Sequence, residues 1–336
     1  MSKGRFSFAA FAGILLLVLA IAGGLNYVID PLWYAQGNRI TGKNFAFNER
    51  ISKINLLDRT ADQGWDCLIL GSSRVTSLRA SSFEGLRCFN LSLKGAEAPE
   101  QLAYGRYARE RGLRPRVLIV AVDDFNFVDR PTTARRTQPH VEGTPSAWHA
   151  FFSTDVLTFS LMTLAGVSPE SNYYDRNFDQ QVLYDTSPYA PHGEDKPDLP
   201  CSKKRIETFR EIRALFPEAR ALAYAPLMSP WYLFNDVYSR GLLDCTLDAY
   251  HAVARDYDAF LDFGIPSAIT IDNQMTSDGT HFKPQANDAV ARGLQGREDG
   301  LALDVKARSL EDYRTTVRDR LHAFATEHGL LGFWKH

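Results

Sequence analysis

The chain has 336 residues, of which 45% are hydrophobic and 23% are charged; this is the balance of a globular protein and excludes a fibrous or disordered chain. The net charge is −2 and no long run of Lys or Arg occurs, so a nucleic-acid partner is not expected. The length allows one large domain or two modest ones.

The N-terminal segment is apolar. Residues 6–29 contain no charged side chain, and a helix needs about 20 apolar residues to cross a bilayer. Lys3 and Arg5 precede this segment and no Lys or Arg follows until Arg39, which predicts a cytoplasmic N-terminus and translocation of the rest. The alternative is a cleaved signal peptide, which normally has a shorter apolar core. We therefore expect residues 1–29 to be a single transmembrane anchor.

The remaining chain alternates strands with helices. Residues 30–60, rich in Asn and charge, are expected to form a juxtamembrane connector with one helix at 48–58. Apolar strands are predicted at 67–70, 88–93, 116–122 and 219–225, and helices at 99–110, 203–216, 247–260 and 309–328. This alternation predicts an α/β fold in which a mainly parallel sheet lies between two layers of helices.

Residues 129–200 interrupt the alternation with loop-like mixtures of Pro, Thr, Arg, Asn and Tyr. They contain one helical candidate near 155–164 and end in a polar loop at 187–200. We expect this segment to be an insertion at the edge of the sheet, within a domain of residues 61–336.

The chain has four cysteines, which suits an oxidising compartment. Cys67 and Cys88 are each the first residue of a predicted apolar strand. If these strands are parallel neighbours, the two cysteines lie opposite each other and their sulfurs could form a disulfide. Cys201 and Cys245 would then form the second pair. Four cysteines allow three connectivities, so this preference depends on the strand argument alone. Four unpaired buried thiols, the alternative, would suit a cytosolic protein.

Residues suited to nucleophilic catalysis follow the predicted strands, and sites in parallel sheets gather at these strand ends. Ser73 follows the first strand in a Gly-x-Ser turn, and Gly95 follows the second, where an unhindered N–H could face an oxyanion. Late in the chain, Asp278 precedes His281 by three residues and can bend back to accept a hydrogen bond from Nδ1. The Nε2 atom is then left to take a proton from a serine.

These blocks resemble those of the SGNH, or GDSL, superfamily of serine esterases and acyltransferases. The first block, Gly-Asp-Ser, is similar to Gly-Ser-Ser at 71–73, and the oxyanion glycine of the second falls on Gly95 within NLSLKGA. The last block, Asp-x-x-His, falls on Asp278 and His281. The similarity spans roughly residues 65–292.

More narrowly, the layout is similar to membrane-anchored SGNH-like proteins that accompany bacterial exopolysaccharide acylation. Their anchor ends in a motif like NYVIDP, here residues 26–31, and their last block reads like DGTHFKP, here residues 278–284. The resemblance implies a flavodoxin-like sheet and acyl-ester chemistry on a polysaccharide, without a metal or organic cofactor. It also implies an inner-membrane protein with its bulk in the periplasm, with a membrane-bound acyltransferase as a candidate partner.

The third block departs from the family pattern. Gly-x-Asn-Asp aligns with Ala-Val-Asp-Asp at 121–124, so Asp123 replaces the oxyanion-binding Asn. An ionised carboxylate would repel an oxyanion, so Asp123 would have to be protonated, or point elsewhere while Asn126 or a backbone N–H substitutes. Loss of one oxyanion donor typically costs about 100- to 1,000-fold in rate.

The sequence contains weaker evidence for other kinds of catalytic or binding site. No phosphate-binding glycine loop occurs, and the carboxylate pair at 123–124 suits a structural role as readily as glycosidase chemistry. No zinc site is expected, because no paired spacing with Cys or Asp is found at His140, His149, His192 and His251. Either a sugar-binding groove or ordinary packing would suit the aromatic residues Trp148, Phe151, Phe152, Trp231 and Tyr232.

The sequence thus predicts a serine O-acyl esterase or acyltransferase acting on a cell-surface polysaccharide. Ser73 would attack the acyl carbonyl, with His281 as general base and then acid, and Asp278 would orient the imidazole. The N–H groups of Ser73 and Gly95 would hold the oxyanion. Hydrolysis and transfer share one acyl-enzyme, so both stay open. The alternative, favoured by Asp123, is a catalytically weak glycan-binding or scaffold module of an acylation complex.

Overall fold

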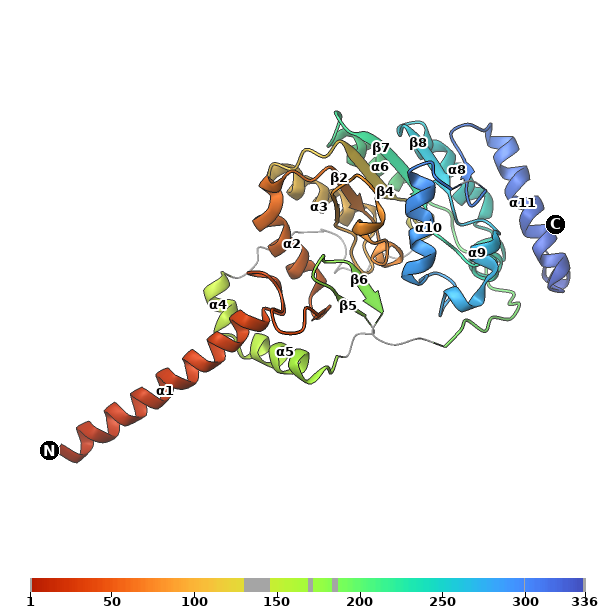
Figure 1. Cartoon of the computed structure of the whole chain (residues 1–336). Coiled ribbons are helices and arrows are strands. Elements are labelled where there is room, and N and C mark those ends of the chain that lie inside the picture. Colours follow the sequence, from red (N-terminus) through yellow and green to blue (C-terminus); the bar gives the residue numbers. More distant parts are fainter. Residues whose placement is uncertain (1, 130–145, 169–171, 183–186, 299, 335–336) are drawn as a thin grey trace. The chain divides into compact units, whose positions relative to one another are not determined.

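A computed structural model of the chain describes residues 2–129, 146–168, 172–182, 187–298 and 300–334. The chain divides into two compact units (Figure 1). The first comprises Met1–Arg59 and Glu142–Tyr184, and the second comprises Thr60–Val141 and Asp185–His336. Each unit is described by itself.

The first unit contains the apolar N-terminal helix α1 (Ser2–Ile29). Its segment Phe8–Ile29 is largely exposed, and it is long and apolar enough to cross a membrane. The other helices are α2 (Glu49–Thr60), α4 (Ala147–Phe151) and α5 (Thr154–Ala165). The helices predicted near 48–58 and 155–164 are therefore confirmed.

Residues 30–59 belong to this compact unit together with part of the segment predicted to be an insertion. The buried carboxylate of Asp30 accepts the N–H groups of Tyr34, Ala35 and Gly37, which folds the chain back directly after α1. A small antiparallel sheet then joins β1 (Asn44–Phe45), β5 (Asn172–Tyr174) and β6 (Gln180–Val182). Strands of two or three residues have too short a pattern to be predicted from sequence.

The second unit is built on a six-stranded sheet in the order β3-β2-β4-β7-β8-β9. All neighbouring pairs are parallel except β8 and β9. The strands are β2 (Cys67–Leu70), β3 (Cys88–Asn90), β4 (Val117–Ala121), β7 (Arg220–Ala225), β8 (Ala259–Asp262) and β9 (Leu303–Asp304). The five parallel strands follow the flavodoxin-like order 2-1-3-4-5. The expected α/β fold with a mainly parallel sheet is confirmed.

Helices cover both faces of this sheet. On one face, α3 (Ala98–Glu110), α6 (Arg205–Ala214) and α8 (Leu243–Ala254) pack in succession, and α11 (Leu310–Glu327) packs on α8. A Cβ on Gly105 of α3 would lie 3.3 Å from the Leu70 side chain, so this glycine lets the helix approach β2 closely. On the other face, α10 (Pro284–Leu294) packs in a buried cluster with Ile69 and Ile119.

The helix predicted at 247–260 is wrong at its C-terminal end, because α8 stops at Ala254 and β8 begins at Ala259. Asp258 starts the new strand: its N–H donates to Ala221 O, and its carboxylate accepts the Ala221 N–H over 2.7 Å. A short apolar run fits the helical and the strand period equally well, so only the pairing with β7 identifies it as a strand.

The two ends of the segment 129–200 lie side by side. Asp129 N–H donates to Pro200 O and Ser202 N–H donates to Phe127 O, both over 2.8 Å. The chain therefore leaves the sheet after β4 and returns to the same place. A disulfide between Cys201 and Cys245, with a Cα–Cα distance of 5.9 Å, ties the returning chain to α8.

The preferred disulfide between Cys67 and Cys88 is absent: both are free, buried thiols. The strand argument itself holds, since the two residues are level partners on β2 and β3. Both side chains belong to the apolar cluster between the sheet and α10, where Cys packs as a small hydrophobe. Burial raises the pKa of the Cys67 thiol well above its ordinary value, which disfavours the thiolate that disulfide formation needs. The disulfide at 201–245 and the apolar helix still indicate a location outside the cytoplasm.

Candidate active site

The site predicted from sequence lies where the strand order reverses. The neighbours β2 and β4 lead to β3 on one side and β7 on the other, and ligands of such sheets bind beyond the carboxyl ends of strands at this point. Ser73 follows β2 by three residues, and Asp123 follows β4 by two. The topology therefore brings these two residues to one edge of the sheet.

A tight turn positions Ser73 after β2. A Cβ on Gly71 would lie 2.8 Å from Val75 Cγ2 and 2.9 Å from Ala121 Cβ, so the turn can pack only without a side chain there. Ser72 Oγ accepts the N–H of Arg74 over 3.2 Å and caps a short 3₁₀ helix, η2 (Ser73–Val75). Ser73 is the first residue of that helix, and it is half-buried.

A second turn positions His281. Asp278 Oδ1 accepts the N–H groups of Thr280 and His281, each over 2.8 Å, so the carboxylate bends back over its own loop. Gly279 takes a φ of +84°, and a Cβ there would lie 2.8 Å from the Tyr189 ring. Gly279 is therefore required both for the left-handed backbone and for the contact with Tyr189.

Ser73, His281 and Asp278 form a connected chain of contacts. His281 Nε2 lies 2.8 Å from Ser73 Oγ, and His281 Nδ1 lies 2.6 Å from Asp278 Oδ2. With its proton on Nδ1, the ring donates to Asp278 and can accept the Ser73 hydroxyl proton at Nε2. The side chains of His281 and Asp278 are 46% and 50% exposed, so the arrangement is open to solvent. Partial burial works against the Asp278 charge, but the hydrogen bond from His281 holds the pKa of Asp278 below its usual range.

Gly95 lies beside the serine turn. Leu93 N–H donates to Gly71 O over 3.0 Å, which continues the pairing of β3 with β2. Gly95 and Ser73 each follow this pair by two residues, so both come directly after the paired part of β3 and β2. Gly95 is exposed with a φ of +70°, and a Cβ there would meet nothing within 4 Å.

The side chain of Asp123 is fully buried and lies next to Ser72 in the turn after β2. Its Oδ1 accepts the Ser72 hydroxyl over 3.1 Å, while its buried Oδ2 has no hydrogen-bond partner among the described residues. Burial raises the pKa of Asp123 to about 6, and the nearby charge of Arg74 opposes this rise. The pKa of this buried carboxylate, which is bonded to the residue before Ser73, is therefore not far from neutrality.

The Asn126 amide is used within the fold. Its Oδ1 accepts the N–H of Ala98 over 2.8 Å, and its Nδ2 donates to Asp123 O over 3.2 Å. This side chain fixes the loop after β4 to the start of α3 and is buried. It is thus occupied away from the expected oxyanion position, which leaves backbone N–H groups for that task.

Sequence reasoning missed the buried Arg74. Its Nη1 lies 2.5 Å from Asp124 Oδ1 and 3.7 Å from Asp123 Oδ1, and its Nη2 donates to Tyr232 Oη over 3.2 Å. Burial works against its charge, but Asp124 and the other neighbours raise the Arg74 pKa above its ordinary value. The sequence features that could have indicated this ion pair are an Arg directly after Ser73 and the adjacent carboxylates Asp123 and Asp124 after another strand.

The polar loop 187–200 also reaches the site through Tyr189. The Tyr189 N–H donates to Asn273 O and Thr276 O, both over 3.1 Å. Burial, together with the charges of Asp236 and Asp278, raises the pKa of Tyr189 to about 12. Farther along, Asn235 in the π-helix at Leu233–Tyr238 accepts the N–H of Glu194 and fixes the loop there. A π-helical turn often marks a functional region.

The remaining histidines and aromatic residues lie elsewhere. Among the described residues, no three His, Cys, Asp or Glu side chains are grouped to hold a metal; His140 lies outside these residues. Trp231 packs edge-on against Phe324 and His328 at centroid distances of 5.4 and 5.3 Å, which favours packing over sugar binding for this residue. The other predicted groove residues divide between the units: Trp148, Phe151 and Phe152 belong to the first and Tyr232 to the second.

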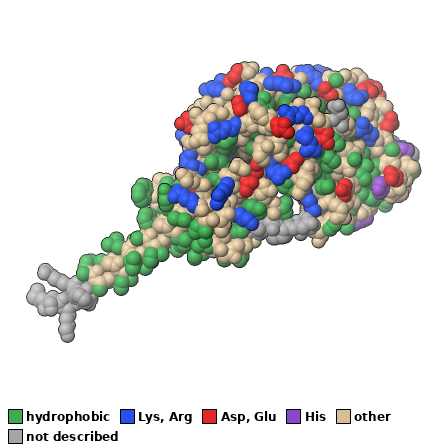
Figure 2. All heavy atoms as spheres, viewed as in Figure 1, with side chains coloured by type: hydrophobic (Ala, Val, Ile, Leu, Met, Phe, Trp, Pro, Cys, Tyr) green, Lys and Arg blue, Asp and Glu red, His purple; other side chains and the backbone are tan. Residues whose placement is uncertain are grey.

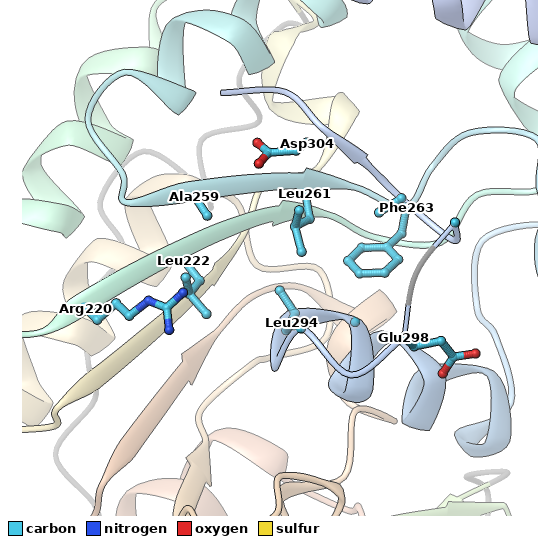
Figure 3. A pocket seen from close by; sticks show the side chains of 12 residues that line it. Arg220, Leu222, Ala259, Leu261, Phe263, Leu294, Glu298 and Asp304 are labelled. Atoms are coloured by element: carbon cyan, nitrogen blue, oxygen red, sulfur yellow. The ribbon is translucent and has the colours of Figure 1, made fainter. Parts of the chain in front are cut away.

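A cavity of about 310 Å³ lies on the sheet face beside α10 (Figure 3). Leu222, Leu261 and Phe263 point into it from the strands and their ends, and Leu294 closes it from α10. None of the predicted site residues lines this cavity. This cavity is therefore separate from the contacts of Ser73 with His281.

Comparison with known proteins yields distant structural likenesses only. No protein-family model and no curated protein matches the chain. The structure is similar to a crystal structure of a putative acylhydrolase from Bacteroides fragilis, with a TM-score of 0.34 and 13% sequence identity. The similarity covers 71% of this chain and 94% of that one.

Proposed function

We propose that the second unit is an extracytoplasmic serine O-acyl esterase or acyltransferase acting on an acylated polysaccharide. The observation that carries the proposal is the contact of His281 Nε2 with Ser73 Oγ at 2.8 Å, while Nδ1 faces Asp278 at 2.6 Å. The two blocks are 208 residues apart in sequence, and contact between unrelated exposed residues would not align both ring nitrogens in this way.

The reaction follows from these contacts. Ser73 Oγ attacks the acyl carbon and His281 Nε2 takes the serine proton. The negative charge that develops on the carbonyl oxygen is held by the N–H groups of Ser73 and Gly95. When the bond to the sugar oxygen breaks, His281 returns the proton to that oxygen and leaves an acyl-serine. Water or an acceptor hydroxyl then attacks the acyl carbon and gives its proton to His281 Nε2. The bond from the acyl carbon to Ser73 Oγ breaks and His281 returns the proton to Ser73, so hydrolysis and transfer differ only in the second nucleophile.

The polysaccharide substrate and the partner come from the resemblance of residues 26–31 and 278–284 to proteins of exopolysaccharide acylation. The exposure of His281 and Asp278 supports a large substrate, because a polymer can reach an open edge more readily than a deep cavity. A membrane-bound acyltransferase fits as the partner that would supply or receive the acyl group.

We further propose that α1 is retained as a single inner-membrane anchor with the bulk of the chain in the periplasm. Asn26, near the end of α1, is fully buried and bonded to Phe151 O, Ser153 O and Ser160 Oγ. A cut near residue 25 would leave Asn26 in place but would remove Gly23, which is buried against the Phe152 ring. The first unit would then lose packing surface, which supports an anchor over a cleaved signal. N-terminal sequencing of the mature protein should read from Met1 or Ser2, and a start near residue 25 would reject the anchor.

The enzymatic test uses the full chain purified in detergent. It should release acid from a small acetyl ester and form an adduct with a serine-directed fluorophosphonate. Ser73→Ala should abolish both, whereas Ser277→Ala, an exposed serine next to Asp278, should keep both. Release of acetate from an O-acetylated exopolysaccharide then tests the substrate, and transfer to an added glycan separates acyltransferase from esterase.

The second candidate is a catalytically weak glycan-binding module. The buried carboxylate of Asp123 favours it, since a family donor is missing there. A wild-type protein that neither labels nor hydrolyses, with Asp123→Asn equally silent, would support this module instead of the enzyme.

A further inference from the structure

An exposed apolar surface surrounds the end of α1 in the first unit. It is formed by the collar residues Trp148, Phe152, Leu161, Leu164 and Val167, which are between 41% and 74% exposed. Figure 1 shows α4 and α5 beside the last turns of α1, and Figure 2 shows hydrophobic side chains along α1 and at its base. Single exposed apolar residues are ordinary, but a group contributed by adjacent helices marks an interaction surface.

Buried polar contacts fix this surface at one level of the anchor. Asn26 Nδ2 donates to Phe151 O over 2.8 Å, and Asn26 Oδ1 accepts the Ser160 hydroxyl over 2.9 Å. One turn earlier, a Cβ on Gly23 would lie 2.7 Å from the Phe152 ring, so the glycine admits that side chain. The helices α4 and α5 are therefore held against the last two turns of the apolar segment Phe8–Ile29. Those turns lie where a spanning helix leaves the bilayer core.

The helix α5 has a buried inner face and an exposed outer face that carries apolar side chains, as expected for contact with lipid. Val156, Ser160 and Thr163 are buried on its inner side, while Leu161 and Leu164 are exposed on the outer side. From residue 146 to 168 the chain contains no Lys or Arg, and Asp155 in the first turn of α5 is its single carboxylate. The C-terminal half of the outer side is thus free of charge.

Arg39 lies at the same level of the anchor, and the side chain of Arg176 lies against Gly42 in the turn that contains Arg39 and Lys43. Arg39 N–H donates to Val28 O over 3.2 Å, and the Arg39 guanidinium stands 4.3 Å from the Tyr27 ring centroid. Arg39, Lys43 and Arg176 are all exposed. Arginine and tyrosine at the end of a spanning helix suit the headgroup region, where cations meet lipid phosphates.

We propose that α4, α5 and the turn at 36–43 form a lipid-binding collar in the outer leaflet. The collar residues enter the boundary between headgroups and acyl chains, by about 5–10 Å as for other interfacial helices. Arg39, Lys43 and Arg176 contact the lipid phosphates. The proposal rests on retention of α1 as an anchor and is independent of the acyl chemistry. It assigns the first unit a second membrane contact, which limits its rotation on the bilayer.

The test places an environment-sensitive nitrobenzoxadiazole probe on single cysteines in the full chain. Leu164→Cys and Ile40→Cys report on the collar, and Asp58→Cys, an exposed position on α2 of the same unit, is the matched control. The native free thiols are buried, so the unsubstituted chain treated in the same way gives the blank. Each protein is reconstituted in vesicles of phosphatidylcholine and phosphatidylglycerol that contain lipids spin-labelled near the headgroup or near the bilayer centre.

The probes at 164 and 40 should be quenched at least about twofold more than the probe at 58, and more strongly by the headgroup-proximal label. Equal quenching at all three positions in protein that floats with the vesicles would overturn the collar and leave the anchor intact. Shielding of position 164 from aqueous iodide without lipid quenching would assign the surface to a second copy of the chain. Protein that does not float, with an N-terminus near residue 25, would overturn anchor and collar together. Loss of esterase activity in any of these proteins has no bearing on the quenching.

A double substitution on α5 tests the collar while the probe stays at position 40. Leu161→Gln with Leu164→Gln changes exposed side chains only, so the fold should persist, as circular dichroism can check. Quenching of the probe at Ile40 should then fall at least about twofold, while flotation stays complete. Unchanged quenching at Ile40 would contradict a collar that acts as one surface.

Discussion

Ser72 Oγ donates a hydrogen bond to Asp123 Oδ1 over 3.1 Å, so the buried Asp123 carboxylate is bonded to the residue that precedes Ser73. Asp123 is therefore placed behind the serine turn, where its charge acts on the site through the protein interior. Its nearest positive charge is Arg74, at 3.7 Å.

Asp123→Asn should preserve or raise the turnover of a small acetyl ester. The amide oxygen can still accept the Ser72 hydroxyl, while the charge that opposes an oxyanion is removed. The gain in kcat/KM is bounded by the worth of one oxyanion donor, about 100- to 1,000-fold, and should shrink below about pH 6, where the pKa of Asp123 makes the wild-type carboxyl neutral. A tenfold loss at pH 7.5 would show that the carboxylate is needed.

The same variant should change how stability depends on pH. Since burial raises the Asp123 pKa from 3.8 to about 6, the folded protein holds this proton more tightly than the unfolded chain. The resulting stabilisation is full below about pH 4 and is lost as pH rises through 6. Asp123→Asn lacks this loss, so its free energy of unfolding relative to wild type should increase by up to about 3 kcal/mol between pH 4 and 7. Denaturant unfolding at both pH values measures this, and a constant difference would contradict it.

Arg74→Met should destabilise the second unit by about 3–5 kcal/mol, because it leaves the buried Asp124 carboxylate without its partner. Adding Asp124→Asn should restore part of the lost stability, because the double variant no longer contains an unpaired carboxylate at position 124. Thermal unfolding of both single variants and the double variant gives the coupling. Additive losses would mean that the two side chains do not stabilise each other.

Asp278→Asn should lower kcat by about 100- to 10,000-fold with little change in KM. The amide can no longer hold the Nδ1 proton of His281, which lies 2.6 Å from the carboxylate, so the tautomer that accepts the serine proton is lost. Single-turnover ester hydrolysis measures this step. A rate within threefold of wild type would place Asp278 outside the reaction, whatever its position.

The bond between Cys201 and Cys245 should contribute about 2–4 kcal/mol, because it closes a loop with a sequence separation of 44. Replacing both cysteines with serine should lower the unfolding midpoint accordingly. Alkylation should find two reactive thiols, at 67 and 88, only after denaturation without reductant. No alkylation under those conditions would mean that a second disulfide is present.

The layered α/β architecture and the residues at the strand ends could be predicted from the amino-acid pattern alone. Uninterrupted apolar strands such as 116–122 identify a sheet buried on both faces, and parallel strands must release Ser73, Gly95 and Asp123 at the same edge. The short spacing of Asp278 and His281 also fixed their mutual contact, because three residues allow the carboxylate to bend back onto the ring.

The contacts that distant segments make in the interior could not be predicted in this way. Cys67 and Cys88 are neighbours because they are paired in the register of β2 and β3. They nevertheless remain free thiols, because both are buried in the apolar core. Arg74 could not be placed from sequence, because its partner Asp124 is 50 residues away and only the adjacency of β2 and β4 brings the two together. The division into two units depends in the same way on the contacts of Asn26 with residues 151–160, since a buried amide on an apolar helix finds its partners only after the chain has folded back.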